Sequence, residues 1–218
     1  MLNQNPATAR LGYQNAEAIV VAAGLTADQV KLTQSDLILE RQMVAGQTTY
    51  EFPVLDTQQG ASGPAFNTER RLKLQDSFIA AAWGVFPCKP TSATDATFVP
   101  QTYANEIVFS TAGVAAALET LYNSFCSVSM NGTILTPYWS ISRNREVPQT
   151  QQSATNTHAQ TVGGDSGFMP LEPNLIFSGT KNMIVTVQLA APLAAVETFQ
   201  RLRVHYMGYL AQNSTLLK

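Results

Sequence analysis

TFQRLRVHYMGYL, residues 198–210, alternates between two kinds of side chain. Apolar side chains take alternate positions and basic ones lie between them: Leu202, Val204, Tyr206 and Leu210 against Arg201, Arg203 and His205. A period of two residues is typical of a β-strand with one buried face. We therefore predict a strand whose apolar set points into a core, while the basic set faces solvent or another chain.

The same alternation recurs along the chain and predicts a strand-rich domain over residues 35–218. Further strands are expected at 35–43, 49–54, 72–86 with a bend at 80–82, 105–110, 126–135 and 175–189. Turn residues predict hairpins at 45–47, at 178–182 and at Asn131-Gly132, a pair preferred in type I′ turns. Pro53 lacks a backbone donor, which places it at a strand end or a sheet edge. Hairpins joined by long connections favour a mainly β, single-domain antiparallel sandwich of the jelly-roll or Greek-key kind.

Residues 1–34 lack this alternation and form a separate N-terminal region in the prediction. We expect an extended arm up to Gln14 and a short helix from Asn15 to Ala23, because Asn15 can cap it and Gly24 can end it. A second helix is predicted at 113–125, where apolar side chains recur at helical spacing: Val114, Ala117, Leu118, Leu121 and Tyr122.

Charge is scarce in this chain. Only 13% of the residues are charged and the net charge is −2, against a usual charged share of about 25%. The sequence has no basic run or stripe, so we expect no specific nucleic-acid site. It also has no apolar run near the ~20 residues that a membrane span needs. Surfaces rich in hydroxyl and amide groups are less costly to bury than charged ones, which favours contacts with other chains.

The motifs that could carry chemistry are incomplete. Gly164-Asp165-Ser166-Gly167 resembles the nucleophile segment of chymotrypsin-like proteases, but the sole upstream histidine, His158, is only eight residues away, and His205 follows in a predicted strand. Two histidines alone cannot hold a metal ion, and Cys88 and Cys126 are predicted to be buried free thiols. The sequence therefore predicts no enzyme, no catalytic residue, no metal site and no cofactor.

Two surfaces are candidates for binding. The long polar stretch 142–167 and the basic face of the last strand supply the candidate interface: Arg143, Arg145, Gln149, Gln151, Gln152, Arg201 and Arg203. A loop of this length in a compact domain is usually functional. The alternative is a carbohydrate-stacking platform at Tyr138-Trp139, with Trp83 expected in the core. On that interpretation the chain is a carbohydrate-binding β-sandwich module.

Three stretches carry a resemblance to known proteins: 47–55 followed by 69–86, then 126–152, then 173–213 with its Ser-Gly-Thr-Lys-Asn turn and long closing strand. Their order is similar to that of single jelly-roll or β-sandwich capsid and capsid-associated proteins of bacteriophages. The resemblance implies a non-enzymatic virion protein, assembled in the host cytoplasm with copies of itself and other virion proteins. It leaves open whether the chain is a capsid, decoration or connector component.

Overall fold

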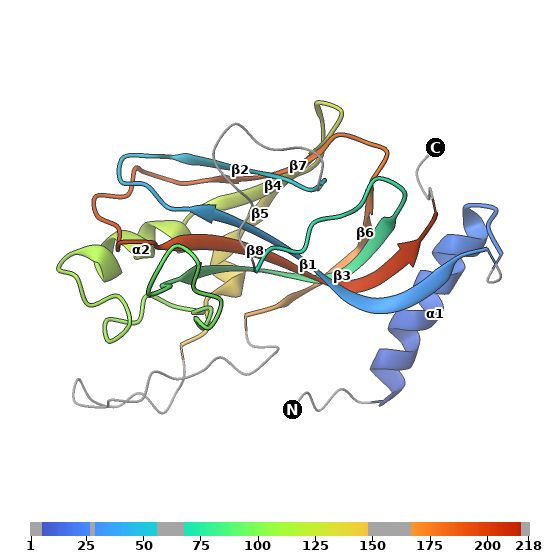
Figure 1. Cartoon of the computed structure of the whole chain (residues 1–218), viewed down its shortest axis with the longest axis horizontal. Coiled ribbons are helices and arrows are strands. Elements are labelled where there is room, and N and C mark those ends of the chain that lie inside the picture. Colours follow the sequence, from blue (N-terminus) through green and yellow to red (C-terminus); the bar gives the residue numbers. More distant parts are fainter. Residues whose placement is uncertain (1–5, 27–28, 56–67, 148–166, 215–218) are drawn as a thin grey trace.

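The structure, a computed structural model, describes residues 6–26, 29–55, 68–147 and 167–214. Eight strands form two antiparallel sheets of four, which face each other across one apolar core (Figure 1). Sheet A has the strand order β1-β8-β3-β6 and sheet B has the order β2-β7-β4-β5. This confirms the predicted β-sandwich.

The strands are β1 (Lys31–Gln42), β2 (Thr49–Pro53), β3 (Ser77–Cys88), β4 (Phe125–Met130), β5 (Thr133–Ser140), β6 (Met169–Ser178), β7 (Met183–Gln188) and β8 (Arg201–Gln212). Two α-helices, α1 (Pro6–Ala22) and α2 (Val114–Tyr122), and one 3-10 turn, η1 (Ile141–Asn144), complete the described elements.

The pairing of the strands is that of a jelly roll. β4 pairs with β5, β3 with β6, β2 with β7 and β1 with β8, so the chain behaves as one long hairpin that is rolled up. Its central turn is Asn131-Gly132, where both residues have positive φ angles of 49° and 82°. Those angles suit the predicted type I′ turn, since Asn and Gly tolerate them best.

The other two predicted hairpins are wrong. β1 and β2, on either side of residues 45–47, lie in different sheets, and so do β6 and β7 on either side of 178–182. In a rolled hairpin, strands adjacent in sequence at these points cross from one sheet to the other. Alternation within a strand shows its two faces but does not show its partner.

The closing strand has the predicted face toward the core. Leu202, Val204 and Tyr206 are fully buried between the sheets, and Leu210 packs against the same core. β8 pairs with both β1 and β3, and the predicted bend appears as a register shift between Ala80 and Ala82. β8 is therefore a central strand, which explains why its apolar set is so regular.

The helices differ in how well the sequence predicts them. α2 buries the five residues expected of it and covers one end of the core, as Figure 1 shows. α1 begins at Pro6, so the predicted arm is largely helical. At the opposite end of the sandwich, its buried residues Ala16 and Val20 pack against Ile79 and Ala211, and the Tyr13 ring meets the Tyr209 ring edge to face. Because few side chains of α1 are buried, its sequence shows little helical periodicity. The strand predicted at 105–110 is a series of turns, and β1 begins at Lys31 instead of Ser35.

Candidate functional site

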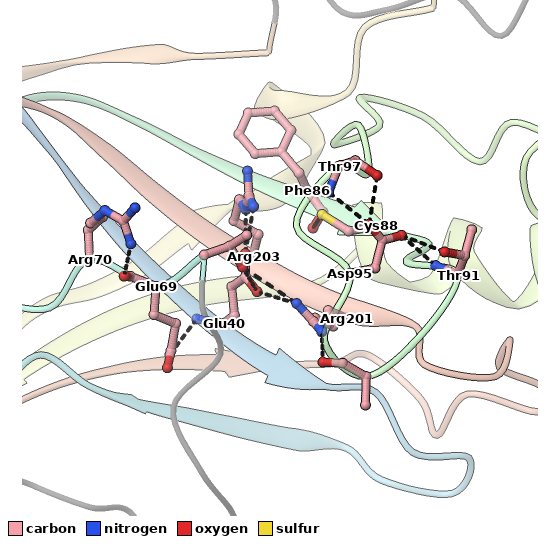
Figure 2. Close-up of polar contacts among 12 residues, drawn as sticks. Glu40, Glu69, Arg70, Phe86, Cys88, Thr91, Asp95, Thr97, Arg201 and Arg203 are labelled. Atoms are coloured by element: carbon pink, nitrogen blue, oxygen red, sulfur yellow. Dashed lines mark hydrogen bonds and ion pairs between the residues drawn. The ribbon is translucent and has the colours of Figure 1, made fainter.

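The two arginines of the predicted interface on β8 lie in a buried charge cluster. Arg201 and Arg203 flank Glu40 of β1, whose carboxylate is fully buried (Figure 2). The Nη1 atom of Arg201 lies 3.1 Å from Oε2 of Glu40, and Nη2 of Arg203 lies 2.6 Å from Oε1. The register places Glu40 directly opposite Arg203, so this contact follows from the β1–β8 pairing.

Two loops cover the cluster on the outer face of sheet A. The Phe98 ring lies over both guanidinium groups, at 5.2 Å from Arg201 and 4.9 Å from Arg203. The carbonyl of Ala93 accepts a hydrogen bond from Arg201, and the Thr68 hydroxyl donates to Glu40. The prediction that the basic face of β8 meets solvent or another chain is therefore wrong for Arg201, while the side chain of Arg203 keeps a small exposed fraction. Alternation places a residue on a face of its sheet, but the loops decide whether that face is covered.

Asp95 holds the covering loop in shape. Its carboxylate accepts hydrogen bonds from the backbone N–H and the hydroxyl of both Thr91 and Thr97, at 2.7 to 2.8 Å (Figure 2). These bonds favour the ionised form and hold the pKa of Asp95 well below its usual range. Since the folded pKa is depressed, this contribution to stability is present above the unfolded pKa and is lost as the pH falls through the folded one. The cluster therefore ties loops to sheet A.

The remaining predicted interface residues lie elsewhere. Arg143 is exposed in η1, and Arg145 pairs with Glu119 of α2 at 3.0 Å, with both side chains about half exposed. Gln149, Gln151 and Gln152 lie outside the described residues. The described members of the candidate interface therefore do not form one surface, because Arg201 and Arg203 lie under loops on sheet A, whereas Arg143 and Arg145 lie in and just after η1, where Arg145 pairs with α2.

The described ends of the long polar loop are joined. The Glu146 carboxylate accepts a hydrogen bond from the Gly167 N–H at 3.0 Å. The Glu146 N–H donates to the Thr102 carbonyl, and the Thr102 hydroxyl donates to the Glu146 carbonyl. The buried Asn144 amide donates to the carbonyls of Gly167 and Trp83. The base of the loop is thus anchored to β3, while residues 148–166, with His158, Asp165 and Ser166, lie outside the described part.

The described residues contain no candidate metal site. Within 6–26, 29–55, 68–147 and 167–214, no group of three or more His, Cys, Asp or Glu side chains could hold a metal ion. His205 lies 3.1 Å from Asp36 and packs against the Phe168 ring. In the same part of the chain, no helix is long and apolar enough to cross a membrane.

Both cysteines are buried free thiols, as predicted. Burial raises the pKa of Cys88 and of Cys126 to about 12, so on the order of one thiol in ten thousand is ionised at pH 8. We expect neither to react with a disulfide reagent in the native protein, and both to react within minutes in denaturant. Absorbance of the released thiolate at pH 8 measures this, and fast labelling of one native thiol would contradict the burial described here.

The described residues leave the outer face of sheet B open. On β2, β4 and β7, buried inward side chains alternate with outward ones that are not buried, and the edge strand β5 has no buried side chain. The outward residues are Thr49, Glu51 and Pro53 of β2, Ile184, Thr186 and Gln188 of β7, Phe125, Ser127 and Ser129 of β4, and Ile134 and Tyr138 of β5. Registers align them in rows across the sheet, such as Glu51, Thr186 and Ser127. Of these eleven residues, which we call the sheet B face, one is charged.

An apolar cluster lies at the β5 side of this face. Tyr138 is 76% exposed and Phe125 is 44% exposed, and their rings meet edge to face at 5.9 Å. Ile134 and Leu135 are also exposed. Leu135 follows Ile134 directly, so alternation places it on the other face of β5. We call Phe125, Ile134 and Tyr138, which lie on the outward face, the β5 cluster. Isolated exposed apolar residues are ordinary, whereas a group on one face is a candidate contact surface.

The predicted aromatic platform divides between the surface and the core. Trp83 is buried as expected, and Trp139 packs against it with ring centroids 5.0 Å apart. Only Tyr138 of the Tyr138-Trp139 pair is left for a ligand. The two side chains alternate across β5, so one sheet face cannot present both.

All four edge strands carry features that oppose strand addition. β2 is short and ends at Pro53, β5 contains Pro137 and two register irregularities, and β6 contains Pro170 and Pro173. At the outer edge of β1, Ile38 and Arg70 exchange two backbone hydrogen bonds, so this part of the edge is already paired. Prolines, bulges and covered edges discourage edge-to-edge pairing. Contacts with another chain are therefore expected to use side chains.

Comparisons of the chain with protein-family models, curated proteins and solved structures found no match.

Proposed function

We propose that this chain is a non-enzymatic structural protein of a bacteriophage virion, assembled with copies of itself and with other virion proteins. In this proposal the chain is a capsid, decoration or connector component. The particle is assembled in the host cytoplasm. The observation that carries the proposal is the nearly uncharged sheet B face, which the described residues leave open, on a jelly-roll frame. Viral capsid domains are among the proteins built on that frame.

The physical argument concerns what a shell subunit needs. A standard interface buries about 1,600 Å² in total, and a subunit with several neighbours buries a multiple of that. Hydroxyl and amide groups lose less on leaving water than ions do. A chain with 13% charged residues can bury much of its surface at low cost. The buried Glu40 cluster and the blunted edges keep the frame rigid and direct contacts to its faces.

A carbohydrate-binding module is the second candidate, favoured by the exposed Tyr138 ring beside Phe125. Lectin domains also use jelly rolls, and an exposed aromatic face can stack on a sugar. A screen of immobilised glycans distinguishes the candidates. Specific binding that Tyr138→Ala abolishes, without loss of the native fold, would favour the module.

The composition of purified particles tests the leading proposal. We expect this chain at a fixed copy number per particle, retained through high-salt washing and measured by quantitative mass spectrometry. A host protein carried through the same purification gives the background. Absence of the chain from infectious particles would contradict a virion role.

A further inference from the structure

We propose that Asn131-Gly132, the turn between β4 and β5, is a site of spontaneous deamidation that the folded turn keeps closed. Conversion of Asn131 takes place only in chains whose turn has opened, and it prevents the turn from forming again. The inference concerns the chemistry of one turn and does not depend on the virion role.

The reaction needs only water. The backbone nitrogen of Gly132 loses its proton and attacks Cγ of the Asn131 side chain. A bond forms between this nitrogen and Cγ, the bond from Cγ to Nδ2 breaks, and Nδ2 takes up a proton and leaves as ammonia. Water then opens the resulting five-membered succinimide ring at one of its two carbonyl carbons. The product is aspartate or isoaspartate, a covalent change that alters the charge and the backbone of the turn.

The residue after Asn131 makes this asparagine the most reactive of the chain. A Cβ on the following residue hinders the attack of its nitrogen on Cγ, and glycine has none. Asn131-Gly132 is the only Asn-Gly pair in the sequence. Both residues are exposed. Beyond its chain neighbours, no described atom lies within 4 Å of the position that a Gly132 Cβ would take, so water reaches the site.

The native turn nevertheless holds the reacting atoms apart. Asn131 and Gly132 have φ angles of 49° and 82°, which suit a type I′ turn, whose first central residue has a ψ of about +30°. That rotation places the Gly132 nitrogen nearly opposite the Asn131 Cβ about the Cα–C bond. Ring closure needs the two atoms nearly eclipsed, because both belong to the five-membered ring. The turn must therefore open before Asn131 can react.

A neighbouring turn adds a second restraint. The Asn182 N–H donates to Oδ1 of Asn131 at 3.0 Å, and the Asn131 N–H donates to the Asn182 carbonyl at 2.7 Å. Oδ1 is bonded to Cγ, so this Asn131–Asn182 contact fixes the reacting carbon as well as the backbone. A turn closes within microseconds, far faster than an amide is lost. The native rate therefore follows the small fraction of molecules whose turn is open.

The isoaspartate product makes the opening permanent. Its backbone runs through the former side chain and contains one further methylene group. A two-residue turn that pairs Met130 with Thr133 does not accommodate this extra length. A chain that stays open long enough to react cannot close the β4–β5 tip again, so unfolding becomes irreversible by chemical modification.

Peptide mapping by mass spectrometry tests the site and its protection. The protein is incubated at pH 8, native or in guanidinium chloride, and the aspartate and isoaspartate forms of Asn131 are quantified over time. We expect conversion in denaturant, and conversion slower by about tenfold or more in the native protein. Asn123 is the internal control, because it is exposed but followed by Ser124, and it is expected to convert more slowly than Asn131 in denaturant. Equal rates for Asn131 in the two states would overturn the protection, and an unreacted Asn131 in denaturant would overturn the site.

Two substitutions at Asn182 test the second restraint. Asn182→Pro removes the N–H that holds Oδ1 of Asn131, whereas Asn182→Ala keeps it. We expect only the proline variant to convert faster than the wild type under native conditions. Equal native rates for both variants would show that the turn alone protects Asn131. If the proline variant has a lowered thermal midpoint, the comparison of native and denatured wild type still decides the proposal.

Asn131→Gly tests the irreversibility. Gly-Gly also suits a type I′ turn, and it has no side-chain amide to react. After incubation in denaturant and dilution, this variant is expected to recover its native circular dichroism, while the wild type loses recovery in proportion to its isoaspartate content. Full recovery of a converted wild type would contradict the permanent opening. None of these outcomes bears on the copy number in particles, which tests the virion role separately.

Discussion

Glu40→Gln is expected to lower the free energy of unfolding by about 3–5 kcal/mol, the cost of breaking a buried ion pair by removing one partner. The Glu40 carboxylate is fully buried between Arg201 and Arg203. An amide keeps the shape but loses the charge, so the two guanidinium groups under Phe98 lose the ion pairs that Glu40 makes with them. Urea unfolding, followed by circular dichroism and fitted with a common slope, measures the change.

The control is Glu119→Gln. Glu119 pairs with Arg145 at 3.0 Å, a length close to that of the buried pair, but its side chain is 48% exposed. Exposed pairs contribute about 0–1 kcal/mol, so the control is expected to change stability little. Equal effects of the two substitutions would show that burial does not govern the Glu40 cluster. A larger effect of Glu40→Gln would mean that Arg201 and Arg203 stabilise the fold. We then expect substitution of either arginine to unfold the chain before it affects a contact with another chain.

Val204→Asp is expected to prevent folding. Val204 is fully buried on β8, paired with Leu39 on one side and Val85 on the other, and it faces the core between the sheets. A carboxylate there has no partner, and its desolvation costs several kcal/mol in addition to the lost packing. Domains have only about 5–15 kcal/mol of stability in total. Soluble yield and the thermal transition measure the result.

Thr186→Asp is the matched control for Val204→Asp. Thr186 is also in the middle of a paired strand, but its side chain is on the sheet B face. The same new carboxylate stays hydrated there, so the monomer is expected to fold with a nearly unchanged thermal midpoint. Tolerance of Asp at 204 together with unfolding by Asp at 186 would reverse the face assignment of both sheets.

Part of the candidate surface can be read from the sequence. The Asn131-Gly132 turn and the alternation around it place Val128 inward and Ser127 and Ser129 outward. Tyr138 was expected at the surface and is exposed. Ile134, Leu135 and Phe125 were missed, because apolar residues in a strand ordinarily indicate a core. Phe125 and Ile134 lie on the outward face of sheet B, and Leu135 lies on its edge strand β5, where no described element buries them.

Local chemistry determined what each segment is. A period of two residues assigned the two faces of β8, a period near 3.6 assigned the buried face of α2, and backbone conformation assigned the Asn131-Gly132 turn. Each of these properties depends on residues a few positions apart, so the sequence alone contains them. The same is true of the low charge and of the buried thiols Cys88 and Cys126.

The tertiary structure decided which segments meet. Leu39 pairs with Val204 and Glu40 with Arg203, more than 160 residues along the chain, because the long hairpin is rolled so that first and last strands are neighbours. Alternation is identical whether a strand's outer face meets water or a loop, so it could not show that Phe98 and Ala93 cover Arg201. Burial of a charge depends on such distant partners, and only the folded chain supplies them.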